Sequence, residues 1–379
     1  MDTIAVPHNS NGSNGLMFQT TKWDGSPMDA AYAKTRMRNE PIVEVTQVKG
    51  DSETHPLLSP NDEYADFETM PFRVGAWTPS KPDGSYVRQA YLRGLEMAAQ
   101  GKGNPYKFGL IGASDTHVGA GAFDEDNYWS KIGLVDSNAK LRGSVPLDSP
   151  TQSGSVYNEN NFQTWSASGL AAVWADSNTR GDVFDAMRRK ETYATTGPRM
   201  KLRFFASDNF ERRILKRANM VERAYRQGVS MGSDLALKDN QTPEFLLWAL
   251  RDARSQGLQR LQIVKGWLKA DGTSAEKVFD VACAGGKSPN AKHRCPDNGA
   301  KVDVKTCKAS AKTAANELKT TWRDPEYVSG QQAFYYVRVL ENPSCRWSSW
   351  DALRAGVAPR PDVDATIQER AYSSPIWVN

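Results

Sequence analysis

The sequence contains little of several residue types that would narrow its function. Four histidines and four cysteines occur among 379 residues, so metal-binding and disulfide-forming side chains are scarce. No apolar run reaches the length of a membrane-spanning helix, and the mean hydropathy of −0.61 agrees with that absence. No run rich in lysine and arginine with interleaved aromatic residues occurs, which argues against a nucleic-acid partner. A signal-peptide pattern is missing as well, because the first residues lead directly into the apolar residues 4–6.

The residues that are present indicate a folded protein of two domains. Aromatic residues make up 10% and charged residues 24% of the chain, a composition that excludes a disordered protein. The net charge is −5 over residues 1–200 and +9 over the remainder. This change of sign and the chain length lead us to expect a domain at residues 1–206, a helical connector at 207–230 and a second domain at 231–379.

The first domain alternates short apolar segments with segments of good helix formers. This alternation is typical of βαβ units and a parallel sheet, so the expected fold class is α/β. We expect strands at 4–6, 42–45, 108–112 and 193–196, and helices at 28–38, 86–100 and 182–190.

The second domain has a different pattern, with β-rich runs separated by loops that contain glycine, proline and asparagine. Such a series favours an antiparallel, sandwich-like domain that follows a basic helix at 210–226. We expect its strands at 245–250, 261–268, 277–282, 318–322, 334–340 and 375–378.

Polar residues at the strands of the first domain are the candidates for chemistry. His8 follows the strand at 4–6, Glu44 lies within the next strand, and Asp115 and His117 follow the strand at 108–112. The carboxyl ends of parallel strands converge, so these side chains are expected to meet. A buried Glu44 needs a compensating charge, and imidazole with carboxylate suits Zn²⁺, Mn²⁺ or Fe²⁺. The pattern therefore predicts a metal site.

Simpler interpretations of the same residues remain open. His8 alone could be a hydrogen-bonded histidine at a strand end, and Glu44 alone could pair with an arginine. A serine esterase would use Ser10 or Ser114 with a histidine and an aspartate. The sequence has no Gly-x-Ser-x-Gly motif, which makes this alternative the weaker one.

Segments along nearly the whole chain resemble one family. They are Ile-Ala-Val-Pro-His-Asn-Ser-Asn (4–11), Gly-Ala-Ser-Asp-Thr-His-Val-Gly (112–119), Tyr-Ala-Thr-Thr-Gly-Pro-Arg (193–199), Glu-Asn-Pro-Ser-Cys-Arg-Trp-Ser (341–348) and Ala-Tyr-Ser-Ser-Pro-Ile-Trp-Val (371–378). In these segments the chain is similar to the domain of unknown function 3604 family, related to the PHP (polymerase and histidinol phosphatase) superfamily of metal-dependent phosphoesterases.

The resemblance implies a distorted β/α barrel followed by the sandwich-like domain. His8, Glu44, Asp115 and His117 would bind the divalent metal, and Asp115 would also take part in catalysis. Arg199 would lie nearby and hold an anionic group of a small substrate, or else form an ordinary salt bridge.

The chain departs from the family pattern in one respect. The His-x-His pair of the first barrel strand is missing, and about four parallel strands are expected instead of seven or eight. The chain therefore resembles a version that lacks the N-terminal part of the barrel, and a missing barrel segment or a second copy is the expected partner. His55 is expected to be a loop residue rather than a further ligand, with Glu53 as an alternative carboxylate near the site.

The four cysteines all lie in the second domain. Cys283, Cys295, Cys307 and Cys345 occur in a loop-rich region, which favours two disulfides in any of three pairings. A zinc site that uses His293 and Cys295 is the alternative, although no Cys-x-x-Cys pair supports it. Disulfides would place the protein in the periplasm or outside the cell.

Together these patterns predict a metal-dependent hydrolase. Metal-activated water would attack a phosphoester or related anionic bond. The alternatives are a non-catalytic remnant, whose β-rich domain binds a glycan or a protein, and a serine esterase.

Overall fold

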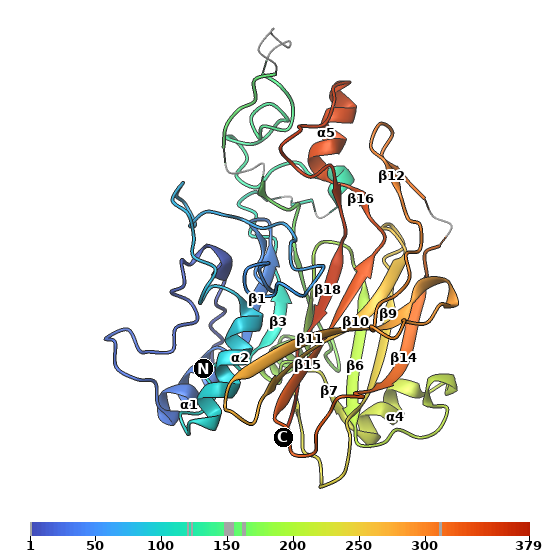
Figure 1. The fold of residues 1–379 in the computed structure, drawn as a ribbon. Helices are drawn as coiled ribbons and strands as arrows, with labels where there is room; N and C mark the ends of the chain where they lie inside the picture. Colours follow the sequence, from blue (N-terminus) through green and yellow to red (C-terminus); the bar gives the residue numbers. More distant parts are fainter. Residues whose placement is uncertain (1, 120, 123, 148–154, 161–163, 311–312) are drawn as a thin grey trace.

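The helices of the protein are few and lie on the outside of its sheets. A computed structural model describes residues 2–119, 121–122, 124–147, 155–160, 164–310 and 313–379 (Figure 1). The described α-helices are α1 (Ala30–Asn39), α2 (Val87–Ala99), α3 (Arg180–Arg188), α4 (Met220–Gln227) and α5 (Trp347–Ala355), and the 3₁₀ turns are η1 (Ser10–Gly12), η2 (Glu125–Asn127), η4 (Ile214–Lys216) and η5 (Ala284–Gly286).

Two sheets form the body of the molecule, and all but one of their described strand pairs are antiparallel. The larger has the order β11-β10-β15-β18-β5-β4, with β19 paired to both β15 and β8. The smaller has the order β14-β9-β6-β7. Their strands are β4 (Leu170–Val173), β5 (Thr192–Thr195), β6 (Lys201–Ser207), β7 (Val229–Ser230), β8 (Asp234–Leu235), β9 (Glu244–Leu250), β10 (Leu258–Leu268), β11 (Ser274–Cys283), β14 (Glu317–Arg323), β15 (Ala333–Glu341), β18 (Arg370–Ser373) and β19 (Ile376–Val378).

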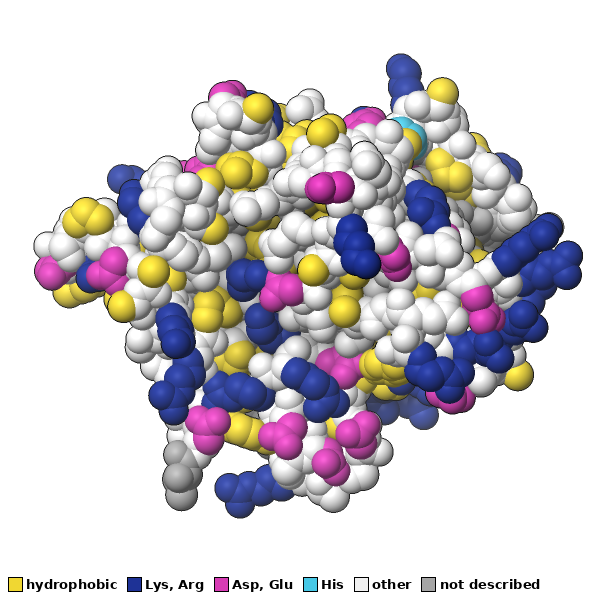
Figure 2. Space-filling view, turned by 90° about the horizontal axis from the view of Figure 1, so that it is seen from below, with side chains coloured by type: hydrophobic (Ala, Val, Ile, Leu, Met, Phe, Trp, Pro, Cys, Tyr) yellow, Lys and Arg dark blue, Asp and Glu magenta, His cyan; other side chains and the backbone are white. Residues whose placement is uncertain are grey.

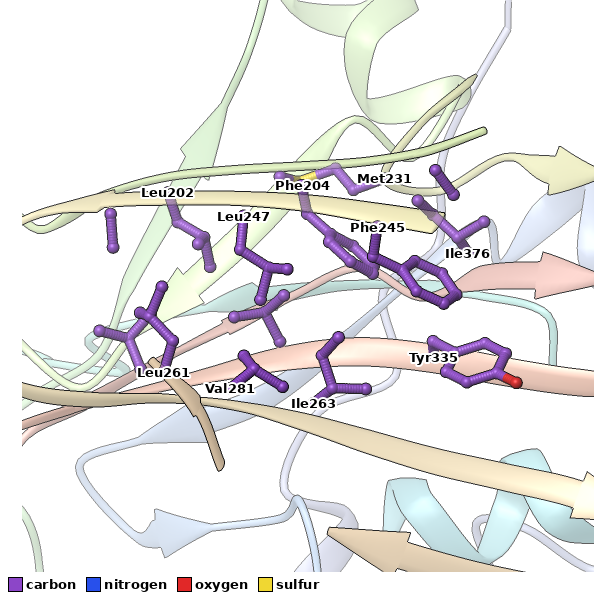
Figure 3. Close-up of a cluster of buried hydrophobic side chains, with 14 of the residues drawn as sticks. Leu202, Phe204, Met231, Phe245, Leu247, Leu261, Ile263, Val281, Tyr335 and Ile376 are labelled. Carbon is purple, nitrogen blue, oxygen red and sulfur yellow. The ribbon is translucent and has the colours of Figure 1, made fainter. Parts of the chain in front are cut away.

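The main hydrophobic core lies between these two sheets (Figure 3). Phe204 and Phe245 of the smaller sheet point toward Ile263 and Tyr335 of the larger one, and all four side chains are buried. The rings of Phe245 and Tyr335 have centroids 4.5 Å apart. Burying this much apolar surface from both sheets is what holds the sandwich together.

A third sheet of three strands packs beside the sandwich and carries the candidate site. It contains β1 (Ile42–Gln47), β2 (Gly50–Asp51) and β3 (Gly109–Gly112), and β1 runs parallel to β3. Helix α2 joins this sheet to the sandwich, because Tyr91 contacts both Phe108 and Phe334 with ring centroids 5.5 and 5.2 Å away. Two short hairpins, β12 (Val302–Asp303) with β13 (Lys308–Ala309) and β16 (Ser344–Cys345) with β17 (Thr366–Ile367), complete the described strands.

The expected α/β class with a partial β/α barrel is wrong, because the described chain is built mainly of antiparallel sheets. Strand β5 was expected in a parallel sheet, but it pairs antiparallel with both β4 and β18. Of the strands expected in the first domain, β1 and β3 alone form a parallel pair in the described part of the chain. The error arises because a strand buried on both faces reads as a continuous apolar run whichever direction its neighbours take.

The expected strand at residues 4–6 is not formed either. Ala5 donates one backbone hydrogen bond to the carbonyl of Asn39 at 2.8 Å, and Glu44 donates one to the carbonyl of Pro7 at 3.0 Å. The segment thus lies alongside β1 without entering its ladder.

The positive charge of the later part of the chain gathers around α4. Figure 2 shows a group of Lys and Arg side chains on the right of the molecule, the side on which Figure 1 places α4, with further Lys and Arg side chains across the rest of this face. Several of these cations are paired locally, as in the contacts of Glu211 with Arg217 at 2.9 Å and with Arg223 at 2.7 Å.

The cysteines form two disulfide bonds, as expected. They join Cys283 to Cys295 and Cys307 to Cys345. Bonds of this kind are typical of periplasmic and extracellular proteins. None of the helices in the part of the chain that the structure describes combines the length and the hydropathy needed to cross a bilayer.

Candidate functional site

The parallel pairing of β1 and β3 brings two charged residues together just beyond the strands. Glu44 of β1 is in register with Ile111 of β3, and both strands lead into loops on the same side. Lys49 from the first loop and Asp115 from the second form an ion pair between Nζ and Oδ2. The convergence expected at the carboxyl ends of parallel strands is therefore present.

A second lysine reaches the same carboxylate from a distant loop. The Nζ of Lys131 lies 3.1 Å from Oδ2 of Asp115 and donates to the Asp115 backbone carbonyl at 2.6 Å. The same Nζ is 3.1 Å from Nε2 of His117, whose backbone amide donates to the Lys131 carbonyl at 2.7 Å. Asp115 and His117 are themselves in contact, with Oδ1 and Nε2 3.4 Å apart. We call Lys49, Asp115, His117 and Lys131 the strand-end site.

Glu44 is tied to the strand-end site through polar neighbours. Its Oε1 accepts hydrogen bonds from the Asn9 backbone amide at 3.2 Å and from Nε2 of Gln47 at 2.9 Å. Lys49 in turn donates to the side-chain oxygens of Asn9 at 3.3 Å and Gln47 at 3.4 Å. Burial raises the pKa of Glu44, against the hydrogen bond from Gln47 that lowers it. The carboxylate therefore lies beneath the site rather than in its opening.

Burial and neighbouring charges lower the pKa values of the basic groups of the site. Loss of solvent, aided by the charge of Lys131, lowers the pKa of Lys49 to about 7. Loss of solvent lowers the pKa of Lys131 to about 8. The Lys131 ammonium lowers the pKa of His117, which is the most open member, with 59% of its side chain exposed. A ligand entering from solvent would therefore meet His117 first.

Two residues at the site hold a strained backbone conformation. Asn9 has φ of 53° and Asp115 has φ of 47°, both in the left-handed region that non-glycine residues rarely adopt. Such strain persists where the surrounding structure enforces it and is common at functional sites. At Asp115 the backbone carbonyl is fixed by the Lys131 ammonium.

The other residues considered from sequence lie elsewhere. His8 is exposed and influences Glu44 through its charge alone. Arg199 is exposed, and its backbone amide donates to Oδ2 of Asp252 at 2.6 Å. Burial raises the pKa of Asp124, and the charge of Arg199 opposes that rise; Asp124 lies outside the strand-end site. The site therefore unites Asp115 and His117 but not Arg199.

The structure shows what the two alternative site residues, His55 and Glu53, contact. His55 accepts a hydrogen bond from the Leu57 backbone amide at 3.1 Å within its own turn, as a loop residue would. Glu53 is buried and forms ion pairs with Arg88 and with Arg338, the latter at 3.1 Å.

The described residues do not form the contacts that the alternative zinc site or the alternative serine esterase site would need. Cys295 is in a disulfide, and His293 packs on the ring of Phe279 with centroids 4.9 Å apart. The hydroxyl of Ser114 accepts from the Thr116 amide at 3.4 Å, and that of Ser10 has no hydrogen-bond partner in the described part. Neither hydroxyl contacts a histidine there.

A model of one protein family matches the chain from end to end. It describes proteins of unknown function, DUF3604, and covers residues 1–379. The chain belongs to the DUF3604 family. No curated protein and no solved structure shows significant similarity to it. The family description names no activity, and neither it nor the fold supports the implied relationship to the PHP superfamily.

The arrangement in this DUF3604 protein does not fit a divalent metal ion. The ammonium groups of Lys49 and Lys131 both contact Oδ2 of Asp115, where a metal would bind. In the described part of the chain, no three His, Cys, Asp or Glu side chains are arranged to hold an ion. The metal site predicted from the sequence stays a prediction.

The lysines of the site were missed in the sequence. Lys49 follows β1 in Gln-Val-Lys-Gly, so its place just beyond a buried strand was an available signal. Lys131 lies in a long loop without hydrophobic periodicity, and tertiary folding alone brings it to Asp115. In the DUF3604 chain these two residues supply the positive charge that a metal was expected to supply.

Proposed function

We propose that this protein is a hydrolase that binds a small anionic ester, such as a phosphoester, at the strand-end site. The observation that supports this proposal is the meeting of two lysine ammonium groups, from Lys49 and Lys131, on one carboxylate beside an imidazole. Paired ammonium groups in a partly desolvated site stabilise the charge that develops on a phosphoryl group in the transition state.

Substrate would bind by exchanging partners with Asp115. The anionic group takes over the ammonium groups of Lys49 and Lys131, which now share the Asp115 carboxylate. Asp115 is then free to accept a proton from the attacking water while the bond between phosphorus and the leaving oxygen breaks. The leaving aryloxide departs to solvent and takes up a proton there, and His117 can carry the proton of Asp115 to solvent because it is exposed. Glu44 keeps Gln47 and Asn9 in place, and those two side chains position Lys49.

Hydrolysis of a panel of aryl phosphate monoesters and diesters tests the proposal. The full chain is assayed with a chelator and, separately, with added Mn²⁺, Zn²⁺ or Fe²⁺. The proposal expects turnover in chelator, reduced at least about 100-fold in Lys131→Met, the effect typical of removing one transition-state contact. Lys140→Met is the matched control, because this lysine is exposed and donates to the Leu147 carbonyl at 2.6 Å, outside the strand-end site. Turnover that appears only with added metal would favour the metal site predicted from sequence.

Binding of phosphate without turnover would instead favour the non-catalytic alternative. Lys131→Met would then lose phosphate binding while no ester in the panel is cleaved by any variant.

A further inference from the structure

A loop beside the strand-end site exposes apolar side chains to solvent. Ile132, Leu134 and Val135 follow Lys131 closely in the chain, and they are 40%, 88% and 48% exposed. Single exposed apolar residues are common on protein surfaces, whereas a group of them beside a binding site marks a surface that contacts a ligand or partner. We call these three residues the apolar loop.

The apolar loop is held in place by the buried carboxylate of Asp136. Its Oδ2 accepts a hydrogen bond from the Lys131 amide at 2.7 Å, and its Oδ1 accepts one from the Ile132 amide at 3.0 Å. Bonds to a charged acceptor are stronger than bonds between neutral groups. Gly133 turns the chain with φ of 82°, in the left-handed region that favours glycine. The loop therefore presents its apolar side chains from an ordered turn.

The same turn is joined to the opening of the strand-end site. The Lys131 carbonyl accepts from the His117 amide at 2.7 Å, and Nζ of Lys131 lies 3.1 Å from Nε2 of His117. Gly133 lies against Val118, because a β-carbon at Gly133 would be 3.2 Å from Cγ1 of Val118. Lys131 is buried, whereas Ile132, the next residue, is exposed. An anion held by Lys131 would therefore have the apolar loop directly beside it.

Charge and polarity together indicate what covers this loop. The strand-end site offers two ammonium groups, from Lys49 and Lys131, and the loop adds an apolar surface next to them. One molecule satisfies both features when its anionic group binds the lysines and its hydrocarbon part lies on the loop. A hydrocarbon chain in this position would also cover His117, the most open member of the site, and so strengthen the ion pairs by excluding bulk water.

We propose that the substrate of the strand-end site is amphiphilic, an anionic ester whose alcohol part carries a hydrocarbon chain. This inference rests on the proposed function, which assigns the anionic group to Lys49 and Lys131. Binding energy from the hydrocarbon part, which does not react, holds the ester against the groups that do. The apolar loop then selects among phosphoesters by the length of their apolar part.

Isothermal titration of the full chain with methyl phosphate and octyl phosphate, below micelle-forming concentrations, tests the inference. Octyl phosphate should bind at least about tenfold tighter than methyl phosphate, because part of its chain leaves water. The ratio of the two affinities should fall at least about threefold in Leu134→Ser and in Val135→Ser. Val328→Ser is the control for Val135→Ser, because this valine is also exposed but lies in the connection between β14 and β15.

The outcomes separate this inference from the proposed function. Equal affinities for methyl and octyl phosphate that both fall in Lys131→Met would overturn the inference and leave the proposed function standing. Absence of binding of either phosphate, or affinities that Lys131→Met does not change, would contradict both. If the loop variants fail to fold, as judged by their thermal melts, the comparison of the two phosphates in the wild type still decides.

Other occupants of the apolar loop would give different results. An octyl phosphate advantage that persists in Leu134→Ser and Val135→Ser would place the hydrocarbon chain elsewhere. Binding to phosphatidylglycerol vesicles, or self-association, that is lost in Leu134→Ser without any octyl phosphate advantage would assign the loop to a membrane surface or to a second copy. Each of these results would overturn the inference.

Discussion

Asp115 is the residue on which the strand-end site depends, because both lysines and the imidazole contact it. Its carboxylate forms ion pairs with both Lys49 and Lys131 in the free protein. The same carboxylate is the group that would accept the proton from water in the proposed reaction. The negative charge of Asp115 therefore competes with an anionic substrate for the two lysines, but the proposed turnover requires it.

Asp115→Asn should separate these two effects. Removing the negative charge leaves two ammonium groups uncompensated, so inorganic phosphate should bind about tenfold tighter. Turnover of the best ester should fall at least about 100-fold because the proton acceptor is lost. Phosphate titration and steady-state kinetics measure the two quantities, with Asp362→Asn as the matched control. Weaker phosphate binding together with unchanged turnover would show that Asp115 has neither role.

Glu341 should make folding stability depend on pH. Burial, with the nearby charge of Asp252, raises its pKa from 4.5 to about 8 in the folded protein. Between these values the unfolded chain releases the proton and the folded chain retains it. The stabilisation from the protonated group is therefore complete below about pH 4.5 and is lost as the pH rises through about 8.

Urea unfolding of Glu341→Gln between pH 5 and pH 9 measures this contribution. Between pH 5 and pH 9 the free energy of unfolding should fall in both proteins. The fall should be smaller in the variant than in the wild type by at least about 1 kcal/mol. Glu63→Gln, at an exposed carboxylate, serves as the control. Parallel pH profiles for the wild type and Glu341→Gln would contradict the expectation.

At the scale of single residues, the sequence predicted part of the strand-end site. Asp115 and His117 were recognisable because a polar Asp-Thr-His follows a buried apolar strand. The role of Lys131 was not recognisable, since its contact with Asp115 joins residues 16 positions apart through an irregular loop. Arg199 was expected nearby because strand ends converge in a barrel, and the antiparallel pairing of β5 removes that reason.

At the scale of elements, short strands were located more reliably than their pairing. The apolar runs correspond to β1, β3 and β5, and the helix-forming segments correspond to α1, α2 and α3. Pairing direction depends on contacts between distant segments, such as Ala371 with Thr195. Local sequence carries no signal for such contacts, and this is why the expected barrel is wrong.

The two disulfides should contribute unequally to stability. Cys307 and Cys345 are 38 residues apart and Cys283 and Cys295 are 12 apart, so the first bond restricts the unfolded chain more. From loop closure alone, we expect losses of about 4 and about 3 kcal/mol when each pair is replaced by serine. Urea unfolding of the two double variants checks the order. A larger loss for the Cys283–Cys295 pair would contradict it.

At the scale of the whole molecule, the sandwich supports the sheet that carries the site. Helix α2 contacts the sandwich through Tyr91 and Phe334, and β3 meets the larger sheet where the Leu110 amide donates to Oγ of Ser374 at 2.8 Å. Strands from both halves of the chain, β5 and β10 among them, belong to the one larger sheet. The strand-end site thus lies at the end of a sheet that is packed against the sandwich, and this packing supports the loops that carry Lys49 and Asp115.

The rate of ester hydrolysis in chelator, compared between the wild type and Lys49→Met, tests the proposed function most directly. Lys49→Met keeps the length of the side chain but removes the ammonium group that pairs with Asp115. We expect kcat/KM for the best ester to fall at least about 100-fold, with Lys140→Met indistinguishable from the wild type. Equal rates in the wild type and Lys49→Met would contradict the assignment of hydrolysis to this site.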